Sequence, residues 1–192
     1  MNKLVLASRN AHKIEEMQNM LGKVGIKVLS ALDFQHVEEV DEDQPTLEGN
    51  ALKKARYVHQ VTGLPALSDD TGLEVDALDG APGVYSARYA GEVASYQDNV
   101  LKLLQELGET EKRTARFRTV VAMVTDNEEH TFEGTVEGEI LTSQKGAGGF
   151  GYDPVFRPEG YDLTFAELDS AEKNQISHRG RAIKKFIDFL DA

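Results

Sequence analysis

The sequence predicts an α/β protein built on a mixed β-sheet. Its first half alternates short apolar runs with helical patterns, which is typical of strands connected by helices. Its second half contains two longer strands with alternating apolar residues, separated by a turn at residues 126–128. Such a pair predicts an antiparallel hairpin, so the sheet is expected to combine parallel and antiparallel strands.

Apolar spacing predicts the first three elements. Short apolar runs indicate buried strands at residues 3–7 and 26–30. Between them, apolar residues recur at helical spacing and predict a helix over about 11–21, with Gly22 and Gly25 suited to its end.

The next predicted elements flank a pair of aspartates. Pro45 can open a helix whose apolar face continues until Gly63 breaks it. A short strand at 66–68 then leads into residues 69–72 (DDTG), and a separate strand is predicted at 73–78. A loop rich in glycine and proline follows.

The second half completes the pattern. A helical stripe predicts an amphipathic helix over about 100–107, and another closes the chain at 183–190. The strands of the hairpin are predicted at 117–123 and 132–140. The glycine-rich run 145–151 is expected to be a loop.

Composition and charge exclude several classes of protein. The 192 residues are 40% hydrophobic and 28% charged, which excludes wholesale disorder and predicts one domain over residues 1–192. No apolar run is long enough for a membrane span or a signal peptide, so a cytoplasmic location is expected. There is no cysteine, and the formal charge of −12 opposes binding to nucleic acid.

Two segments carry candidate residues for phosphate and metal chemistry. Ser8–Lys13 lies where a strand turns into a helix, and helix N-termini bind anions. The alternative is that Asn10 only caps the helix and Lys13 is solvated. Asp69 and Asp70 are adjacent carboxylates beside a glycine. They fit a Mg²⁺ site in which one carboxylate accepts a proton, and equally an Asx-type turn.

Two later segments carry further candidate binding residues. In the glycine-rich run 146–154, Phe150 and Tyr152 can present an aromatic face, and Asp153 can accept hydrogen bonds from a ring. The alternative is a flexible turn with core aromatics. The run 173–179 is polar and partly basic, and its arginine donates in a fixed fork; the alternative is a solvated helix start.

Taken together, these segments resemble the inosine/xanthosine triphosphate pyrophosphatase family. Six stretches carry the resemblance in the family's order: 7–13 (ASRNAHK), 50–55 (NALKKA), 68–73 (SDDTGL), 81–91 (APGVYSARYAG), 149–154 (GFGYDP) and 172–179 (EKNQISHR). The resemblance implies an elongated sheet flanked by helices, in two lobes with a substrate cleft between them. It also implies a homodimer and Mg²⁺-dependent hydrolysis of ITP, dITP or XTP to the monophosphate and pyrophosphate.

The resemblance further implies roles for individual residues. Asp70 is expected to be the proton acceptor and a metal ligand, with Asp69 beside it as a second catalytic residue. The expected substrate-binding residues are Ser8, Arg9, Asn10, Ala11, His12, Lys13, Lys54, Thr71, Phe150, Gly151, Tyr152, Asp153, Lys173, His178 and Arg179.

The chain departs from the family pattern at three places, one of which is Gly49, where the family usually has Glu before the helix asparagine and where the neighbouring Glu48 can substitute. Arg9 replaces the small residue that is usual at this position. The usual Glu-Glu pair before the long helix is replaced by residues 41–44 (DEDQ), which leaves the second metal ligand open among Asp41, Glu42 and Asp43. Glu42 is the choice by register.

The expected mechanism depends on charge and on donor–acceptor matching. Lys13 and Lys54 are expected to hold the pyrophosphate leaving group. Arg179 is a pure donor, so it is expected to select the 6-oxo group of hypoxanthine or xanthine against the 6-amino group of adenine. Three other functions stay open: a nucleotide sensor without hydrolysis, a Maf-like pyrophosphatase for modified pyrimidine nucleotides, and a metal-dependent phosphodiesterase, which the negative charge opposes.

Overall fold

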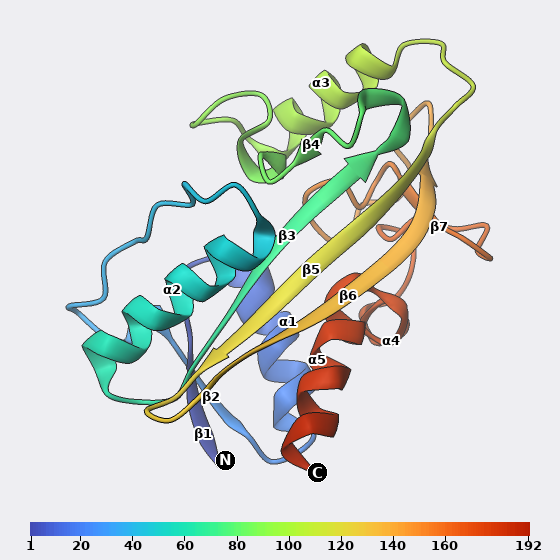
Figure 1. The fold of residues 1–192 in the computed structure, drawn as a ribbon. Helices are drawn as coiled ribbons and strands as arrows, with labels where there is room; N and C mark the ends of the chain where they lie inside the picture. Colours follow the sequence, from blue (N-terminus) through green and yellow to red (C-terminus); the bar gives the residue numbers. More distant parts are fainter. The chain divides into compact units, whose positions relative to one another are not determined.

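The computed structural model describes all residues, 1–192, as a mixed α/β fold (Figure 1). Its strands are β1 (Lys3–Leu6), β2 (Lys27–Ser30), β3 (Ala66–Val75), β4 (Pro82–Gly83), β5 (Thr114–Val124), β6 (Glu129–Ile140) and β7 (Phe156–Pro158). They form one seven-stranded sheet in the order β2-β1-β3-β5-β6-β7, with β4 paired to β3. β1 is parallel to both β2 and β3, whereas the β3–β4 and β6–β7 pairs are antiparallel. The predicted mixed sheet is therefore confirmed.

Helices flank this sheet. They are α1 (Ala11–Gly22), α2 (Leu47–Thr62), α3 (Tyr96–Leu107), α4 (Ser170–Ile176) and α5 (His178–Leu190), with short 3-10 turns η1 (Ala31–Asp33), η2 (Asp76–Leu78) and η3 (Ser86–Arg88). The first four helices begin after residues whose side chains accept hydrogen bonds from the first turn, namely Asn10, Thr46, Ser95 and Asp169. None of the helices combines the length and the hydropathy that crossing a membrane requires.

The chain divides into two compact units. Unit 1 comprises Met1–Asp70, Thr119–Gly134 and Arg179–Ala192, and unit 2 comprises Thr71–Arg118 and Thr135–His178. Each unit has its own core of buried apolar side chains.

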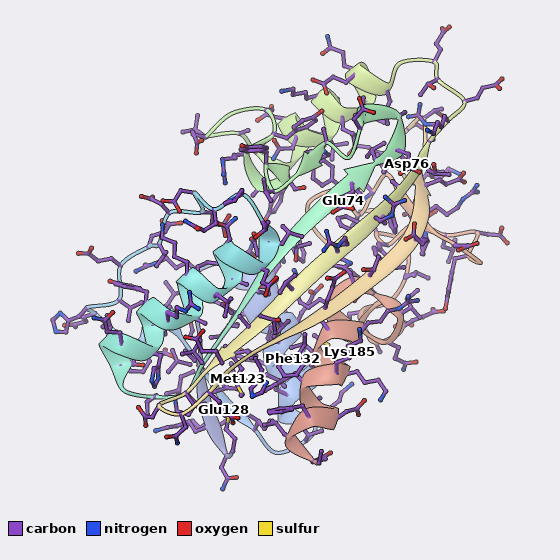
Figure 2. All side chains as sticks on the ribbon, in the orientation of Figure 1. Glu74, Asp76, Met123, Glu128, Phe132 and Lys185 are labelled. Carbon is purple, nitrogen blue, oxygen red and sulfur yellow. The ribbon has the colours of Figure 1, made fainter.

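The core of unit 1 joins the parallel strands to α1 and α5. Its buried members are Leu4, Leu6, Met17, Leu21, Ile26, Leu67, Val121, Met123, Ala182, Ile183 and Phe186. Met123 and Phe132, both labelled in Figure 2, come from the neighbouring strands β5 and β6, and the ring of Phe132 lies 5.5 Å from that of Phe186 on α5. The apolar faces predicted for the first and last helices are confirmed by this packing.

The core of unit 2 is built around aromatic rings. Its buried members are Leu73, Val75, Val100, Leu103, Leu107, Ala115, Phe117, Val136, Ile140, Tyr152, Val155, Phe156 and Phe165. Charged pairs lie outside this core: Asp76, labelled in Figure 2, binds Arg116 at 3.0 Å, and Glu74 binds Arg118 at 2.8 Å.

Three sequence predictions are corrected by the structure. Residues 66–78 do not form two strands, because β3 runs without a break to Val75 and the 3-10 turn η2 then reverses the chain. Asp69 and Asp70 therefore lie within a strand, and the Asx-type turn is wrong. Thr46 caps α2, so Pro45 precedes the helix instead of opening it.

Two short strands were missed. β4 lies in the loop predicted after Gly80, and β7 follows the glycine-rich segment. Neither strand is long enough to show a period of two in the sequence. The hairpin prediction is confirmed, since β5 and β6 are neighbours and the N–H of Thr125 donates to the carbonyl of Glu128 across the turn.

We expect Gly72→Ala to destabilise the protein by about 1–3 kcal/mol, because a Cβ atom there would lie 2.7 Å from the backbone oxygen of Gly83 on β4. The measurement is urea denaturation at neutral pH. Gly22→Ala is the matched control, because a Cβ atom at the end of α1 has no heavy atom within 4 Å and alanine favours helix. Equal stability of the two variants would contradict this interpretation of the β3–β4 contact.

Candidate functional site

The turn between β1 and α1 contains the first candidate segment, Ser8–Lys13. The Oδ1 atom of Asn10 accepts hydrogen bonds from the N–H groups of His12 (3.0 Å) and Lys13 (3.3 Å). The Oγ atom of Ser8 accepts another from the N–H of Asn10 (3.2 Å). Asn10 is therefore the cap of α1, as the alternative interpretation stated. Phosphate binding by this turn stays a prediction.

Lys13 and Arg179 both bind the carboxylate of Asp69 in β3. The Oδ2 atom of Asp69 accepts from Nε (3.1 Å) and Nη2 (3.0 Å) of Arg179 and lies 3.2 Å from Nζ of Lys13. Burial opposes ionisation of Asp69, but the nearby cations, first Lys13 and then Arg179, outweigh it and hold its pKa below the usual range. Lys13 is an ion-pair partner, so the alternative of a solvated lysine is wrong.

Glu16 completes this ion-pair group. Its Oε2 atom lies 2.6 Å from Nη1 of Arg179, whose side chain is only 2% exposed. Glu16 follows Lys13 by three residues, which puts both on one face of α1. Arg179 therefore connects the start of α5 to both β3 and α1. The sequence prediction missed Glu16, although its spacing from Lys13 was an available signal.

The carboxylate of Asp70 binds other side chains than that of Asp69, because successive side chains of a strand point to opposite faces. Its Oδ2 atom accepts from Nδ2 of Asn50 (3.1 Å) and its Oδ1 atom from Nζ of Lys54 (3.3 Å), both on α2. Burial raises the pKa of Asp70, and the charge of Glu42 adds to this effect against the opposing influence of Lys54. A carboxyl group of raised pKa is suited to accept a proton near neutral pH.

Lys54 joins β3 to the acidic loop, which we define as residues 34–46. Its Nζ atom lies 2.5 Å from Oε1 of Glu42 and donates to the backbone oxygen of Asp69 (2.8 Å). Burial opposes the charge of Lys54, but the carboxylates of Asp70 and Glu42 outweigh it and raise its pKa. Burial also opposes the charge of Glu42, and Lys54 overcomes this and lowers the pKa of Glu42.

Glu42 and Asp70 are the candidate magnesium ligands. Lys54 binds both carboxylates, and each carboxylate influences the pKa of the other. No group of three or more acidic, histidine or cysteine side chains is arranged to hold a metal ion. Mg²⁺ is held in nucleotide enzymes by one or two carboxylates together with phosphate oxygens and water. The pair therefore fits a magnesium ion, because a divalent cation relieves the repulsion between two carboxylates.

In unit 2, Phe150, Asp153 and Lys173 form a second group. The Oδ2 atom of Asp153 accepts from the N–H of Phe150 (2.8 Å) and lies 2.8 Å from Nζ of Lys173. Both charged side chains are almost fully buried, with 4% of Asp153 and 6% of Lys173 exposed. The Nζ atom of Lys173 also lies 4.9 Å from the centre of the Phe150 ring, a cation–π contact. Hydrogen bonding of Asp153 to a base stays a prediction.

Tyr152 and His178, also predicted to contact the base, are buried in unit 2. The hydroxyl of Tyr152 donates to the backbone oxygen of Ser86 (2.8 Å), and its ring belongs to the core. The expectation that Tyr152 presents an open aromatic face is therefore wrong. The ring of His178 stacks on Phe117, with 4.5 Å between ring centres. Substrate contact by either residue stays a prediction.

Four other predicted residues lie outside these ion-pair groups. The exposed side chain of Arg9 donates from Nη2 to the backbone oxygen of Val37. Ala11 is the first residue of α1, and Thr71 is half-buried in β3. Gly151 has a φ of 62°, a conformation that glycine adopts without strain.

The structure thus brings most of the predicted side chains into two groups. The group in unit 1 contains Lys13, Glu42, Lys54, Asp69, Asp70 and Arg179. The group in unit 2 contains Phe150, Asp153 and Lys173. Asn50 has a place beside Asp70 that the sequence analysis did not assign, although its spacing of four from Lys54 indicates a shared helix face.

The chain is similar to known proteins over nearly its whole length. The sequence profile of the Ham1 family matches residues 4–189. A dITP/XTP pyrophosphatase of Porphyromonas gingivalis is 52% identical over 192 residues, covering 99% of this chain and 98% of the relative. A protein of the same name from Flavobacterium johnsoniae is 49% identical and covers the same shares. The structure of a HAM1 protein from Coxiella burnetii matches with a TM-score of 0.90 at 41% identity, covering 100% of this chain and 99% of that one.

We expect Arg179→Met to lower the free energy of unfolding by about 3–5 kcal/mol, because it leaves the buried carboxylate of Asp69 with a single cation, Lys13, in direct contact. The measurement is urea denaturation at pH 7. Lys184→Met is the matched control on the same helix, since Lys184 forms an exposed pair with Asp188 and its loss should leave stability unchanged. A similar small effect of both substitutions would argue against a structural role for the buried pair.

Proposed function

This chain belongs to the Ham1 family, and on that premise we propose that it hydrolyses the non-standard purine nucleoside triphosphates ITP, dITP and XTP. The products are the nucleoside monophosphate and pyrophosphate, so the activity removes deaminated purines from the nucleotide pool. The observation that carries the proposal is the group of the half-buried Glu42 with the buried Lys54 and Asp70. This group lies in a chain similar over its whole length to proteins named dITP/XTP pyrophosphatase.

Asp70 is the proposed proton acceptor. The reaction adds water to the α-phosphorus, and the attacking water has to lose a proton. Burial keeps the pKa of the Asp70 carboxyl group raised, and Asn50 orients that group by donating to Oδ2. Asp69 is instead a positioning residue in this proposal, because its carboxylate binds the side chains of Lys13 and Arg179.

Glu42 and Asp70 are proposed to hold a magnesium ion. When bound, this ion neutralises negative charge on the triphosphate. Lys54 keeps the two carboxylates together in the protein, since it binds both. Lys54 and Lys13 also supply positive charge for the pyrophosphate leaving group, in line with the electrostatic nature of phosphoryl transfer catalysis. Ser8 and Asn10 of the β1–α1 turn, with Ala11 and His12 at the start of α1, are proposed to bind the phosphates.

The group in unit 2 is proposed to read the base. Hypoxanthine and xanthine carry an acceptor oxygen at position 6, whereas adenine carries a donor there. The buried ammonium group of Lys173 beside Phe150 donates only, so it favours the 6-oxo bases. Arg179 remains a second proposed donor for this selection, since its guanidinium is held by Asp69 and Glu16 just as the ammonium of Lys173 is held by Asp153.

The same proposal includes the organisation of the protein. We propose that residues 1–192 work as one nucleoside triphosphate pyrophosphatase domain. A homodimer and a cytoplasmic location, where the nucleotide pool is maintained, are further parts of the proposal. Sedimentation equilibrium of the purified chain tests the dimer directly.

A panel of nucleoside triphosphates tests the proposed function. We expect pyrophosphate release from ITP, dITP and XTP in the presence of Mg²⁺, little release from ATP, and loss of release when EDTA removes the metal. The readout is enzyme-coupled detection of pyrophosphate. Binding without release would identify a nucleotide sensor, and preference for dUTP or methylated UTP would identify a pyrimidine enzyme of Maf-like type.

We expect Asp70→Asn to lower kcat for dITP by about 10²–10⁴-fold, because the amide cannot accept the proton of the attacking water. Nucleotide binding, measured by calorimetry, should survive. Asp188→Asn, which alters an exposed carboxylate on α5, is the control and should keep full activity. Undiminished turnover by the Asp70 variant would remove this carboxylate from the mechanism.

A further inference from the structure

The acidic loop (residues 34–46) needs external support to present Glu42. It connects η1 to α2 without a helix or strand of its own, and Figure 1 shows it as a long loop beside α2. Every residue from 38 to 43 except Val40 is Asp or Glu, so the charges of this segment repel one another. Backbone freedom adds an entropic cost to holding one conformation. Side chains from other elements therefore have to fix the loop.

α2 supplies one set of these contacts. Nζ of Lys53 donates to the backbone oxygen of Asp41 (2.8 Å) and lies 2.8 Å from the carboxylate of Asp43. The N–H of Gln44 donates to Oδ1 of Asn50 (2.9 Å). These contacts hold the part of the loop that immediately precedes α2.

The earlier part of the loop is held at a single peptide group, the one between Val37 and Glu38. Arg9 donates from Nη2 to its carbonyl oxygen, and the hydroxyl of Tyr57 on α2 accepts from its N–H (3.0 Å). A peptide group is planar, so holding its carbonyl and its N–H fixes its orientation. The side chain of Val37 is buried, which anchors the same point.

We propose that Arg9 and Tyr57 together clamp this peptide group, and that Arg9 is a positioning residue for Glu42 instead of a phosphate ligand. The guanidinium of Arg9 links the β1–α1 turn to the acidic loop, and Glu42 lies four residues after Glu38 of the clamped peptide. The role of Glu42 as a metal ligand rests on the proposed function. The clamp rests only on the contacts of Arg9 and Tyr57 with the peptide group.

Three variants and a matched control test the clamp. Arg9→Met, Tyr57→Phe and the double variant are compared with the α2 variant Arg56→Met, which removes the same charge from an exposed pair with Glu129 of β6. Hydrogen–deuterium exchange of the peptide 34–46 should be about fivefold faster in either single variant, as the loss of one hydrogen bond implies. Arg56→Met should exchange like the wild type.

Calorimetric titration with Mg²⁺ provides the second readout. Each single variant should bind Mg²⁺ on the order of 10-fold more weakly, the usual effect of losing a residue that supports a metal ligand. The double variant should be little weaker than either single variant, because both side chains act through one peptide group. Rescue of Mg²⁺ binding by Arg9→Lys, which keeps a donor to the carbonyl, would support the clamp further.

Two results would overturn the proposal. If Arg9 holds phosphate, Arg9→Met raises only the KM for nucleotide and leaves loop exchange and Mg²⁺ binding unchanged. If the loss of Mg²⁺ affinity in the double variant equals the product of the two single losses, Arg9 and Tyr57 act independently and not through one peptide group. The exchange measurement needs no substrate, so it tests the clamp even if the wild type releases no pyrophosphate. If the Arg9 variant does not fold, the exchange rate of Tyr57→Phe tests the clamp in its place.

Discussion

The alternation of side chains along β3 is the constraint on which the candidate site depends. Asp69 and Asp70 are neighbours in the chain, yet a strand directs neighbouring side chains to opposite faces. Asp69 therefore binds residues of α1 and α5, whereas Asp70 binds residues of α2. Had these residues formed a turn, both carboxylates could have faced one partner. The strand separates them and gives each its own environment.

Those environments shift the pKa values of two identical side chains in opposite directions. Burial opposes the charged form of each, so the balance depends on which charges lie nearby. Lys13 and Arg179 keep Asp69 ionised, and it then holds both cations in place. Asp70 shares Lys54 with another carboxylate, Glu42, and its pKa is raised. One aspartate thus serves the architecture of unit 1, and the other has the raised pKa that suits the proton transfer proposed for it.

Buried ion pairs also connect the folding of each unit to its own group of candidate residues. A buried charge is costly unless it is paired and hydrogen-bonded, so the pairs Arg179–Asp69 and Lys173–Asp153 have to form as the chain packs. The side chains proposed to meet the substrate are therefore held by the same interactions that complete the cores. This explains why Tyr152, placed in a binding motif by its sequence, is also a core residue whose hydroxyl is used inside unit 2.

The sequence by itself determined the order of the main strands and helices, the hairpin and the family, because hydrophobic periodicity and short motifs are local properties of the chain. It also indicated nearly every side chain of the two groups. It did not determine that β3 continues through the aspartates, that Glu16 reaches Arg179, or that Arg9 holds Val37. These features depend on contacts between residues far apart in the chain, and only the packing of the folded chain decides which side chains come into contact.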